Sequence, residues 1–294
     1  MKFHQSDSHK NDAIYVSEAV GCVLLCAMLL FLLTAAFFGQ EPSVSVQTLI
    51  FKIGGKFLVF VLPALWGVWM LRRSGISFPR EFGRNSLHKD QTVILSSFGL
   101  IVIIQMLYTA VFPAVKTTAN IALAETPAQI FLLFLSVSLI PAVAEEVLFR
   151  GFLMRSLGLF RRSLAVLMSA LTFALMHFSV TGFPLFFACG LILAMSYLST
   201  GSLSVSVGVH FLCNAFWFLA ETVETYLPQY AADVMRGAFV VCVLLCVSGI
   251  PFLKENMRVF FEDEDEPSFP SSQFWTLPTV LFVLTAAAIQ IWFQ

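Results

Sequence analysis

The segment AQIFLLFLSVSLIPAVAEEVLFRGFLMRSLG, residues 128–158, determines the class of fold. It exceeds the roughly 20 apolar residues that a helix needs to cross the hydrocarbon core of a bilayer. It also carries two adjacent carboxylates, Glu145 and Glu146, at a depth where a bilayer normally excludes charge. Each ionisable group inside a span costs at least about 2.5 kcal/mol on insertion scales, so such groups usually mark a functional site. The stretch therefore predicts a membrane helix whose two glutamates belong to a functional site.

The composition of the whole chain agrees with a membrane protein. Of its 294 residues, 58% are hydrophobic and 12% are charged, and this charged share is about half that of a typical soluble domain. Residues 19–40 and 91–115 are free of charge. Because each of these runs is also long enough to cross a bilayer, the composition excludes an ordinary globular enzyme.

The pattern of apolar segments predicts an all-α, polytopic transmembrane helical bundle of about eight or nine spans. No Asp, Glu, Lys or Arg occurs at positions 163–220. Turn residues at 181–184 and 200–202 must therefore divide that stretch into separate helices. We expect one integral membrane domain over residues 1–294. The predicted segments are 16–38, 49–71, 92–115, 128–158, 163–179, 184–199, 202–220, 236–253 and 274–293.

The charged residues predict how the chain lies in the membrane. Most of the 17 basic residues fall on one side if the N-terminus is cytoplasmic, which the positive-inside rule favours. We therefore predict a multi-pass protein of the cell membrane with a cytoplasmic N-terminus. Residues 254–273 are expected to form a polar, acidic loop, and Lys52 and Lys56 to extend towards the membrane interface. The net charge of −1 gives no indication of nucleic-acid binding.

The candidate site residues within the predicted spans lie on the fourth, fifth and seventh helices. Glu145 and His177 stand at equal distances from the hairpin tip between their helices, about 22 Å at 1.5 Å per residue. His210 and Asn214 are expected at a compatible depth. These residues are therefore predicted to meet.

The two glutamates are expected to have different roles. Glu146 and Arg150 are four residues apart, which places them on one helix face for an ion pair. Glu145 points about 100° away from Glu146 and is expected to be free. A free carboxylate at this position suits general base and acid work near neutral pH.

Each of these groups also has a purely structural interpretation. A Glu–Arg pair in a membrane helix can be a buried bridge, and a lone histidine is often a satisfied polar residue between helices. The gathering of these groups in four consecutive helices favours a site. The six cysteines all fall in apolar segments, where they act as small hydrophobes.

Three strings of sequence together resemble one protein family. They are Glu145-Glu146-Val147-Leu148-Phe149-Arg150, Phe173-Ala174-Leu175-Met176-His177 and His210-Phe211-Leu212-Cys213-Asn214. The chain is similar over residues 128–220 to the CAAX-protease and bacteriocin-processing family of intramembrane endopeptidases, also called Abi proteins. The pattern is a Glu-Glu pair with Arg four after the second Glu, a Phe with His four later, and a His with Asn or Asp four later.

The resemblance implies a catalytic core and roles for its residues. Glu145 and His177 would activate a water for attack on a peptide carbonyl, and His210 with Asn214 would bind the oxyanion. Arg150 would hold Glu146. The substrate would be a membrane-associated protein, of the prenylated CAAX type in eukaryotic members of the family.

The role of a metal stays open at this point. Glu145, His177 and His210 would give zinc a carboxylate and two imidazoles with an open water position, and the resembled family has often been described as metal-dependent. The helix-borne His-Glu-x-x-His signature of zinc proteases is absent. The sequence favours a Glu/His-activated water over a metalloprotease, with zinc as a close alternative.

Two other classes of function fit part of the pattern. A proton-coupled membrane transporter could use Glu145 and His177 as a relay, since such chains serve proton movement in transporters. Transporters often contain repeated halves, and no such repeat is evident in the sequence. A catalytically idle membrane scaffold is the third alternative, and the presence of all three motifs argues against it.

Overall fold

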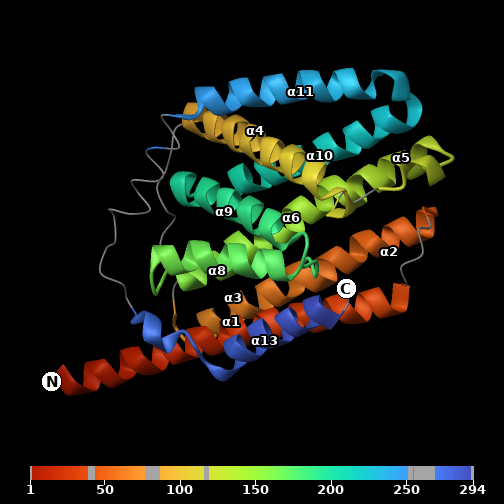
Figure 1. Cartoon of the computed structure of the whole chain (residues 1–294). Coiled ribbons are helices and arrows are strands. Elements are labelled where there is room, and N and C mark those ends of the chain that lie inside the picture. Colours follow the sequence, from red (N-terminus) through yellow and green to blue (C-terminus); the bar gives the residue numbers. More distant parts are fainter. Residues whose placement is uncertain are drawn as a thin grey trace.

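The computed structural model describes residues 2–38, 44–76, 87–115, 119–250, 254 and 269–292. Every regular element within these ranges is a helix, so the prediction of an all-α fold is confirmed (Figure 1). Most of the predicted acidic loop over residues 254–273 lies outside the described residues.

The longer elements are α-helices, and several of them are continued by short helical segments of other types. The α-helices are α1 (Lys2–Phe38), α2 (Val46–Lys56), α3 (Leu62–Arg73), α4 (Leu87–Val111), α5 (Pro127–Phe134), α6 (Ile140–Glu146), α7 (Arg155–Leu157), α8 (Arg162–Leu175), α9 (Phe183–Thr200), α10 (Leu203–Tyr226), α11 (Pro228–Ser248) and α13 (Leu277–Trp292). The π-helical segments are η1 (Phe57–Val61), η4 (Leu135–Leu139) and η5 (Val147–Met154), and the 3₁₀ turns are η2 (Pro113–Val115), η3 (Ile121–Leu123) and η6 (Ser271–Gln273).

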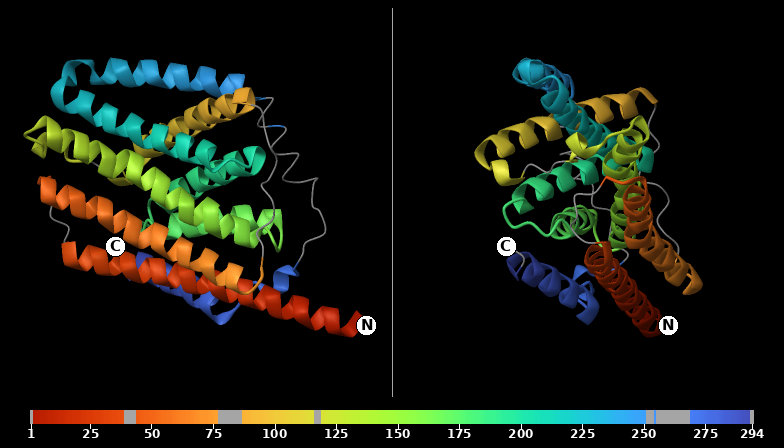
Figure 2. Two further views of the ribbon diagram at one scale, coloured as in Figure 1. Left: turned by 180° about the vertical axis from the view of Figure 1, so that it is seen from behind. Right: turned by 90° about the vertical axis from the view of Figure 1, so that its right-hand side faces the viewer.

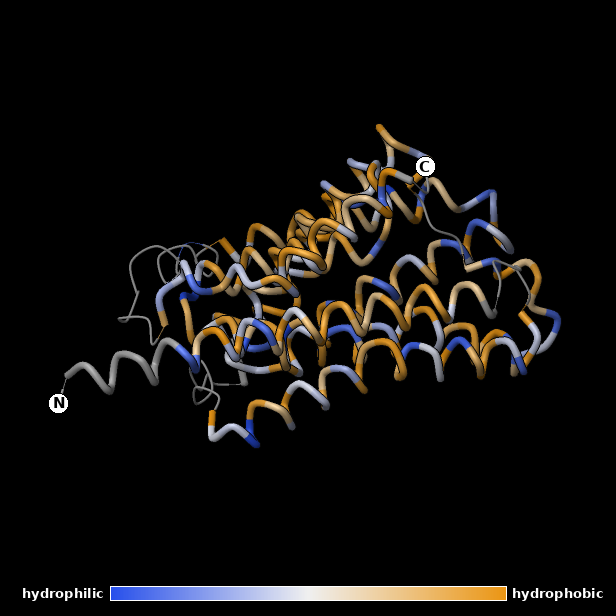
Figure 3. The backbone as a smooth tube through the Cα atoms, turned by 90° about the horizontal axis from the view of Figure 1, so that it is seen from below, coloured by the Kyte–Doolittle hydropathy of each residue, from blue (hydrophilic) through white to orange (hydrophobic). Residues whose placement is uncertain are grey.

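Seven helical stretches in the described part of the chain are long and apolar enough to cross a membrane. Two shorter apolar helices, Arg162–Leu175 and Leu277–Ile291, accompany them. Each of the nine predicted segments coincides with one of these helical stretches, which confirms a polytopic helical bundle. Hydrophobic residues predominate along the middle of the helices, and hydrophilic residues are more frequent towards their ends (Figure 3). The chain is therefore an integral membrane protein.

The helices pack so that the fourth predicted span lies in the middle of the bundle. Helix α13 lies along α1, and α4 crosses the bundle obliquely to contact α9, α10 and α11 (Figure 2). Helix α11 forms the outer edge, where it contacts α4 and α10 (Figure 1). The side chain of Gln290 on α13 donates to the carbonyl oxygens of Ala174 and Leu175, at 3.4 and 3.2 Å. This contact ties α13 to the C-terminal end of α8.

Several predicted segment boundaries differ from the observed helix ends by a few residues, and two of these differences have a structural reason or consequence. The eighth segment begins at Pro228 rather than at residue 236, because a proline is well suited to the first turn of a helix, where its missing N–H has no partner to lose. The fifth helix ends at Leu175 rather than at residue 179. His177 therefore lies in the turn that follows α8, next to Phe178, whose φ of 46° is left-handed.

Two of the π-helical segments stand next to prolines within spans. Pro63 follows η1, and Pro141 follows η4. A proline inside a helix lacks an N–H and clashes with the carbonyl four residues earlier, and here that carbonyl belongs to Val59 or Val137, inside the π-helical segment in each case. The wider π turn accommodates the proline. Such turns occur frequently at functional sites.

The contact between α1 and α13 gives a test of the fold. A Cβ atom at Gly21 would lie 2.5 Å from the backbone nitrogen of Thr279, so Gly21→Ala must push the two helices apart. We expect it to destabilise the protein by about 1–3 kcal/mol, measured by thermal unfolding in detergent. Gly54→Ala is the matched control, because a Cβ at Gly54 would meet nothing within 4 Å. Equal unfolding temperatures for both variants would contradict the close packing of α1 on α13.

Candidate active site

The centre of the bundle holds a fully buried ion pair. Arg150 donates from Nη1 to Oε1 of Glu146 at 2.8 Å, and both side chains have no exposed surface. Its Nη2 donates to the carbonyl oxygen of Gly190 at 2.9 Å, and its guanidinium lies 5.1 Å from the ring centroid of Phe173. The pair expected from the four-residue spacing is therefore present, and it joins the fourth span to α9.

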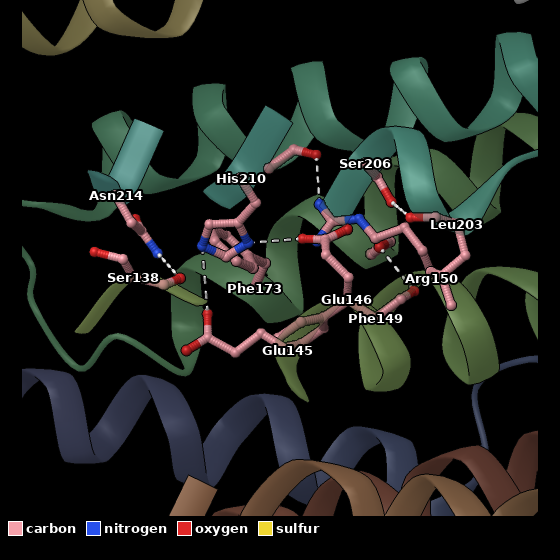
Figure 4. Close-up of polar contacts among 12 residues, drawn as sticks. Ser138, Glu145, Glu146, Phe149, Arg150, Phe173, Leu203, Ser206, His210 and Asn214 are labelled. Atoms are coloured by element: carbon pink, nitrogen blue, oxygen red, sulfur yellow. Dashed lines mark hydrogen bonds and ion pairs between the residues drawn. The ribbon is translucent and has the colours of Figure 1, made fainter. Parts of the chain in front are cut away.

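His210 on α10 contacts the same carboxylate. Its Nδ1 lies 2.9 Å from Oε1 of Glu146 (Figure 4). An ionised carboxylate only accepts hydrogen bonds, so Nδ1 must carry the proton, and in the neutral ring Nε2 is then an acceptor. Nε2 lies 4.0 Å from Oε2 of Glu145. Glu146 thus orients the imidazole, and the free nitrogen of that ring faces Glu145.

Glu145 is paired, which corrects the expectation that it is free. Nζ of Lys56 lies 3.1 Å from Oε1 of Glu145 and donates a hydrogen bond to it. The side chain of Glu145 is 8% exposed and that of Lys56 is 34% exposed. The interpretation of Lys56 as a residue that extends to the membrane interface is therefore wrong. The second span contributes to the site together with the fourth, fifth and seventh.

His177 approaches the site from the turn after α8. Its Nδ1 lies 2.7 Å from the carbonyl oxygen of Phe173, and its ring stacks on that of Phe186 with centroids 3.9 Å apart. Because a carbonyl only accepts, Nδ1 is again the protonated nitrogen and Nε2 is free. His177 is half-buried and close enough to Glu145 for an electrostatic interaction. The expected meeting of the fourth and fifth spans at this level therefore occurs.

Asn214 lies one turn beyond His210 on α10 and reaches the π-helical segment η4. Its Nδ2 is 3.5 Å from the carbonyl oxygen of Ser138 (Figure 4). That separation is at the long limit for a hydrogen bond. The amide is therefore held only weakly and can turn to another acceptor.

Sequence reasoning missed Lys56, although one signal was available. Lys56 is the eleventh residue of the span Val46–Arg73, so it lies about 15 Å from the start of that span. The same depth criterion that selected Glu145 and His177 would have selected Lys56. The signal is ambiguous in the sequence, because a lysine side chain near a helix end is usually explained by contact with the interface.

The residues proposed as zinc ligands do not fit a zinc site in this arrangement. Among the described residues, no three His, Cys, Asp or Glu side chains are grouped so that they could hold a metal ion. Two ligands on tetrahedral zinc lie about 3.3 Å apart at the usual bond lengths, whereas Glu145 and His210 are separated by 4.0 Å. The ammonium of Lys56 also occupies one oxygen of Glu145, and a second cation at this carboxylate would be repelled.

Comparison with known proteins finds one family model that matches the central helices. Residues 127–216 match the family model described as type II CAAX prenyl endopeptidase Rce1-like. Neither a curated protein nor a solved structure matches the chain. The matched residues run from the start of α5 into α10 and include Glu145, His177, His210 and Asn214. Over residues 127–216 the chain is therefore similar to the Rce1-like CAAX protease family.

Proposed function

We propose that the chain is an intramembrane endopeptidase that hydrolyses membrane-associated proteins with a water held between Glu145 and His210. The observation that carries this proposal is the distance of 4.0 Å between Oε2 of Glu145 and Nε2 of His210. That gap is too long for a direct hydrogen bond and is close to the separation that one bridging water spans. Both atoms accept hydrogen bonds, so a water between them would donate one hydrogen to each.

In this mechanism Glu145 is the general base. The carboxylate takes a proton from the water while the water oxygen attacks the peptide carbonyl. Glu145 later gives a proton to the leaving amine. His210 holds the second hydrogen of the water and is itself oriented by Glu146. His177 has a free Nε2, interacts electrostatically with Glu145 and is assigned to the same polar site.

The structure bears on how the oxyanion would be stabilised. An oxyanion needs hydrogen-bond donors, and Nε2 of a neutral His210 carries no hydrogen while Nδ1 donates to Glu146. We therefore assign the oxyanion to the amide of Asn214, which is held weakly by Ser138. His210 would join it only in the imidazolium form.

The substrate class follows from the family that the domain matches. We propose prenylated, CAAX-type proteins as substrates, presented from the cytoplasmic face of the cell membrane to a chain with a cytoplasmic N-terminus. The test is cleavage by protein reconstituted in liposomes of two peptides of identical sequence, one prenylated and one not. Faster cleavage of the prenylated peptide supports the substrate class, and equal rates would contradict it.

We propose that the reaction needs no metal, because Lys56 occupies the carboxylate that zinc would use. Chelation with EDTA or 1,10-phenanthroline is therefore expected to leave the cleavage rate of the purified protein within about 2-fold of the untreated rate, since a water activated by Glu145 needs no Lewis acid. The rate is measured before and after dialysis against each chelator. A loss of activity that zinc restores would contradict this proposal.

A further inference from the structure

Lys56 brings a cation to the candidate site from outside the matched domain. It is the last residue of α2, whereas the family match begins at residue 127. Helix α2 packs against α5, η4 and α6 of the matched domain. A helix that flanks the domain therefore supplies a direct contact to Glu145.

The place of Lys56 in its helix fits a defined role. The π-helical segment η1 begins at the next residue, and η1 itself packs against α6 and η5. The ammonium also lies 5.5 Å from the ring centroid of Phe60, which is buried on the next turn. Both contacts restrict where the ammonium can lie. The lysine is thus held at the depth of Glu145 by the packing of its own span.

The charges of the site form two matched pairs. Lys56 faces Glu145, and Arg150 faces Glu146, with the imidazole of His210 between the two carboxylates. A carboxylate in apolar surroundings is strongly unfavourable unless a cation and hydrogen bonds compensate it. Arg150 has no exposed surface and forms its ion pair with Glu146. Compensation of Glu145 is therefore assigned to Lys56.

The hydrogen bond also fixes the direction of Glu145. Lys56 occupies Oε1 at 3.1 Å, and the other oxygen, Oε2, is the one that lies 4.0 Å from His210. Without the ammonium, rotation about the last side-chain bond of Glu145 would make the two oxygens equivalent and would no longer aim one of them at His210. The water position between Oε2 and Nε2 depends on this rotation.

We infer that Lys56 is a positioning residue of the hydrolytic site, whose ammonium holds Oε1 of Glu145 and so turns Oε2 towards His210 and the attacking water. This inference rests on the proposed function. Lys56 acts through Glu145 and does not touch the reacting atoms. Its loss should therefore lower kcat with little effect on KM.

The test compares Lys56→Ala with Lys52→Ala in liposomes. Lys52 lies one turn earlier on α2 and is exposed, so it is a matched control for the loss of a lysine from this helix. We expect Lys56→Ala to lower kcat by about 10²-fold, the usual effect of misplacing a catalytic group by an ångström, with KM within about 3-fold. Lys52→Ala should retain the wild-type kcat.

Two further measurements separate positioning from a general loss of folding. The kcat of Lys56→Arg should be at least about 10-fold higher than that of Lys56→Ala, because a guanidinium can still donate to Oε1 of Glu145. Methylammonium added to Lys56→Ala should also raise kcat, whereas tetramethylammonium, which has the charge but no N–H, should not. Wild-type kcat in Lys56→Ala overturns the inference. A loss that neither arginine nor methylammonium reverses overturns it too.

The parallel assay of the wild-type protein distinguishes failure of the proposed peptidase activity from failure of the role of Lys56. If the wild-type protein cleaves no peptide, the proposed function fails and the role of Lys56 fails with it. If the wild-type protein cleaves and Lys56→Ala cleaves with the same kcat, the role of Lys56 alone is overturned.

Discussion

Glu145→Gln is expected to lower the rate of peptide cleavage by about 10²–10⁴-fold, the contribution of a general base. Glutamine keeps the shape of the side chain and an oxygen that can accept from Lys56, but it cannot take a proton from water. The unfolding temperature should therefore change little while kcat falls. The measurement is the initial rate of cleavage by wild-type and variant protein in the same liposomes.

Glu125→Gln is the matched control for this variant. Glu125 is exposed and lies just before α5, so it loses the same charge on the approach to the same span. It should retain the wild-type rate. Wild-type activity in Glu145→Gln would refute the role of Glu145 as the base.

Arg150→Met is expected to destabilise the protein by about 3–5 kcal/mol, because removing one partner of a buried ion pair leaves the other charge uncompensated. The variant leaves Glu146 without its cation and removes the side-chain donor to the carbonyl of Gly190. Thermal unfolding in detergent measures the effect. Arg72→Met, at an exposed position near the end of α3, should be close to wild type.

A double variant separates the effect of an uncompensated charge from the effect of altered packing at Glu146 and Arg150. Replacing both charges of a buried pair with apolar residues is often neutral or stabilising. Glu146→Leu combined with Arg150→Met should therefore regain much of the stability that Arg150→Met loses, while activity stays low because His210 has lost its carboxylate. A double variant as unstable as the single one would contradict the assignment of the effect to an uncompensated charge.

The parts of this structure that the sequence predicts are those set by local pattern. Apolar length located all nine helical stretches, and the four-residue spacing predicted the contact of Arg150 with Glu146. These features follow from short-range geometry, which a single sequence records directly.

The contact of Lys56 with Glu145 could not be obtained in this way, because 89 residues separate the two. Its existence depends on α2 packing against α6, and hydropathy does not specify which spans are neighbours. A lysine near the end of an apolar run has the same local pattern whether it reaches the interface or a buried carboxylate. Only the tertiary arrangement distinguishes the two.

The end of α8 shows a second limit of local reasoning. Residues 163–179 are continuously uncharged, so the pattern predicted one helix through His177, yet the helix ends at Leu175. The carbonyls of Ala174 and Leu175 at that end accept from the backbone N–H groups of His177 and Phe178 and also from the side chain of Gln290 on α13, which is 115 residues from Leu175. The end of α8 thus coincides with a contact between spans that are distant in sequence, and hydropathy does not record such a contact.

The proposed role of Glu145 is to activate a water for peptide hydrolysis without a metal. Its most direct test is mass spectrometry of a membrane-tethered, prenylated peptide after incubation with chelator-treated wild-type protein and with chelator-treated Glu145→Gln. We expect two fragments with new termini from the wild-type protein and intact peptide from the variant. Intact peptide in both reactions, or the same fragments in both, would contradict the claim.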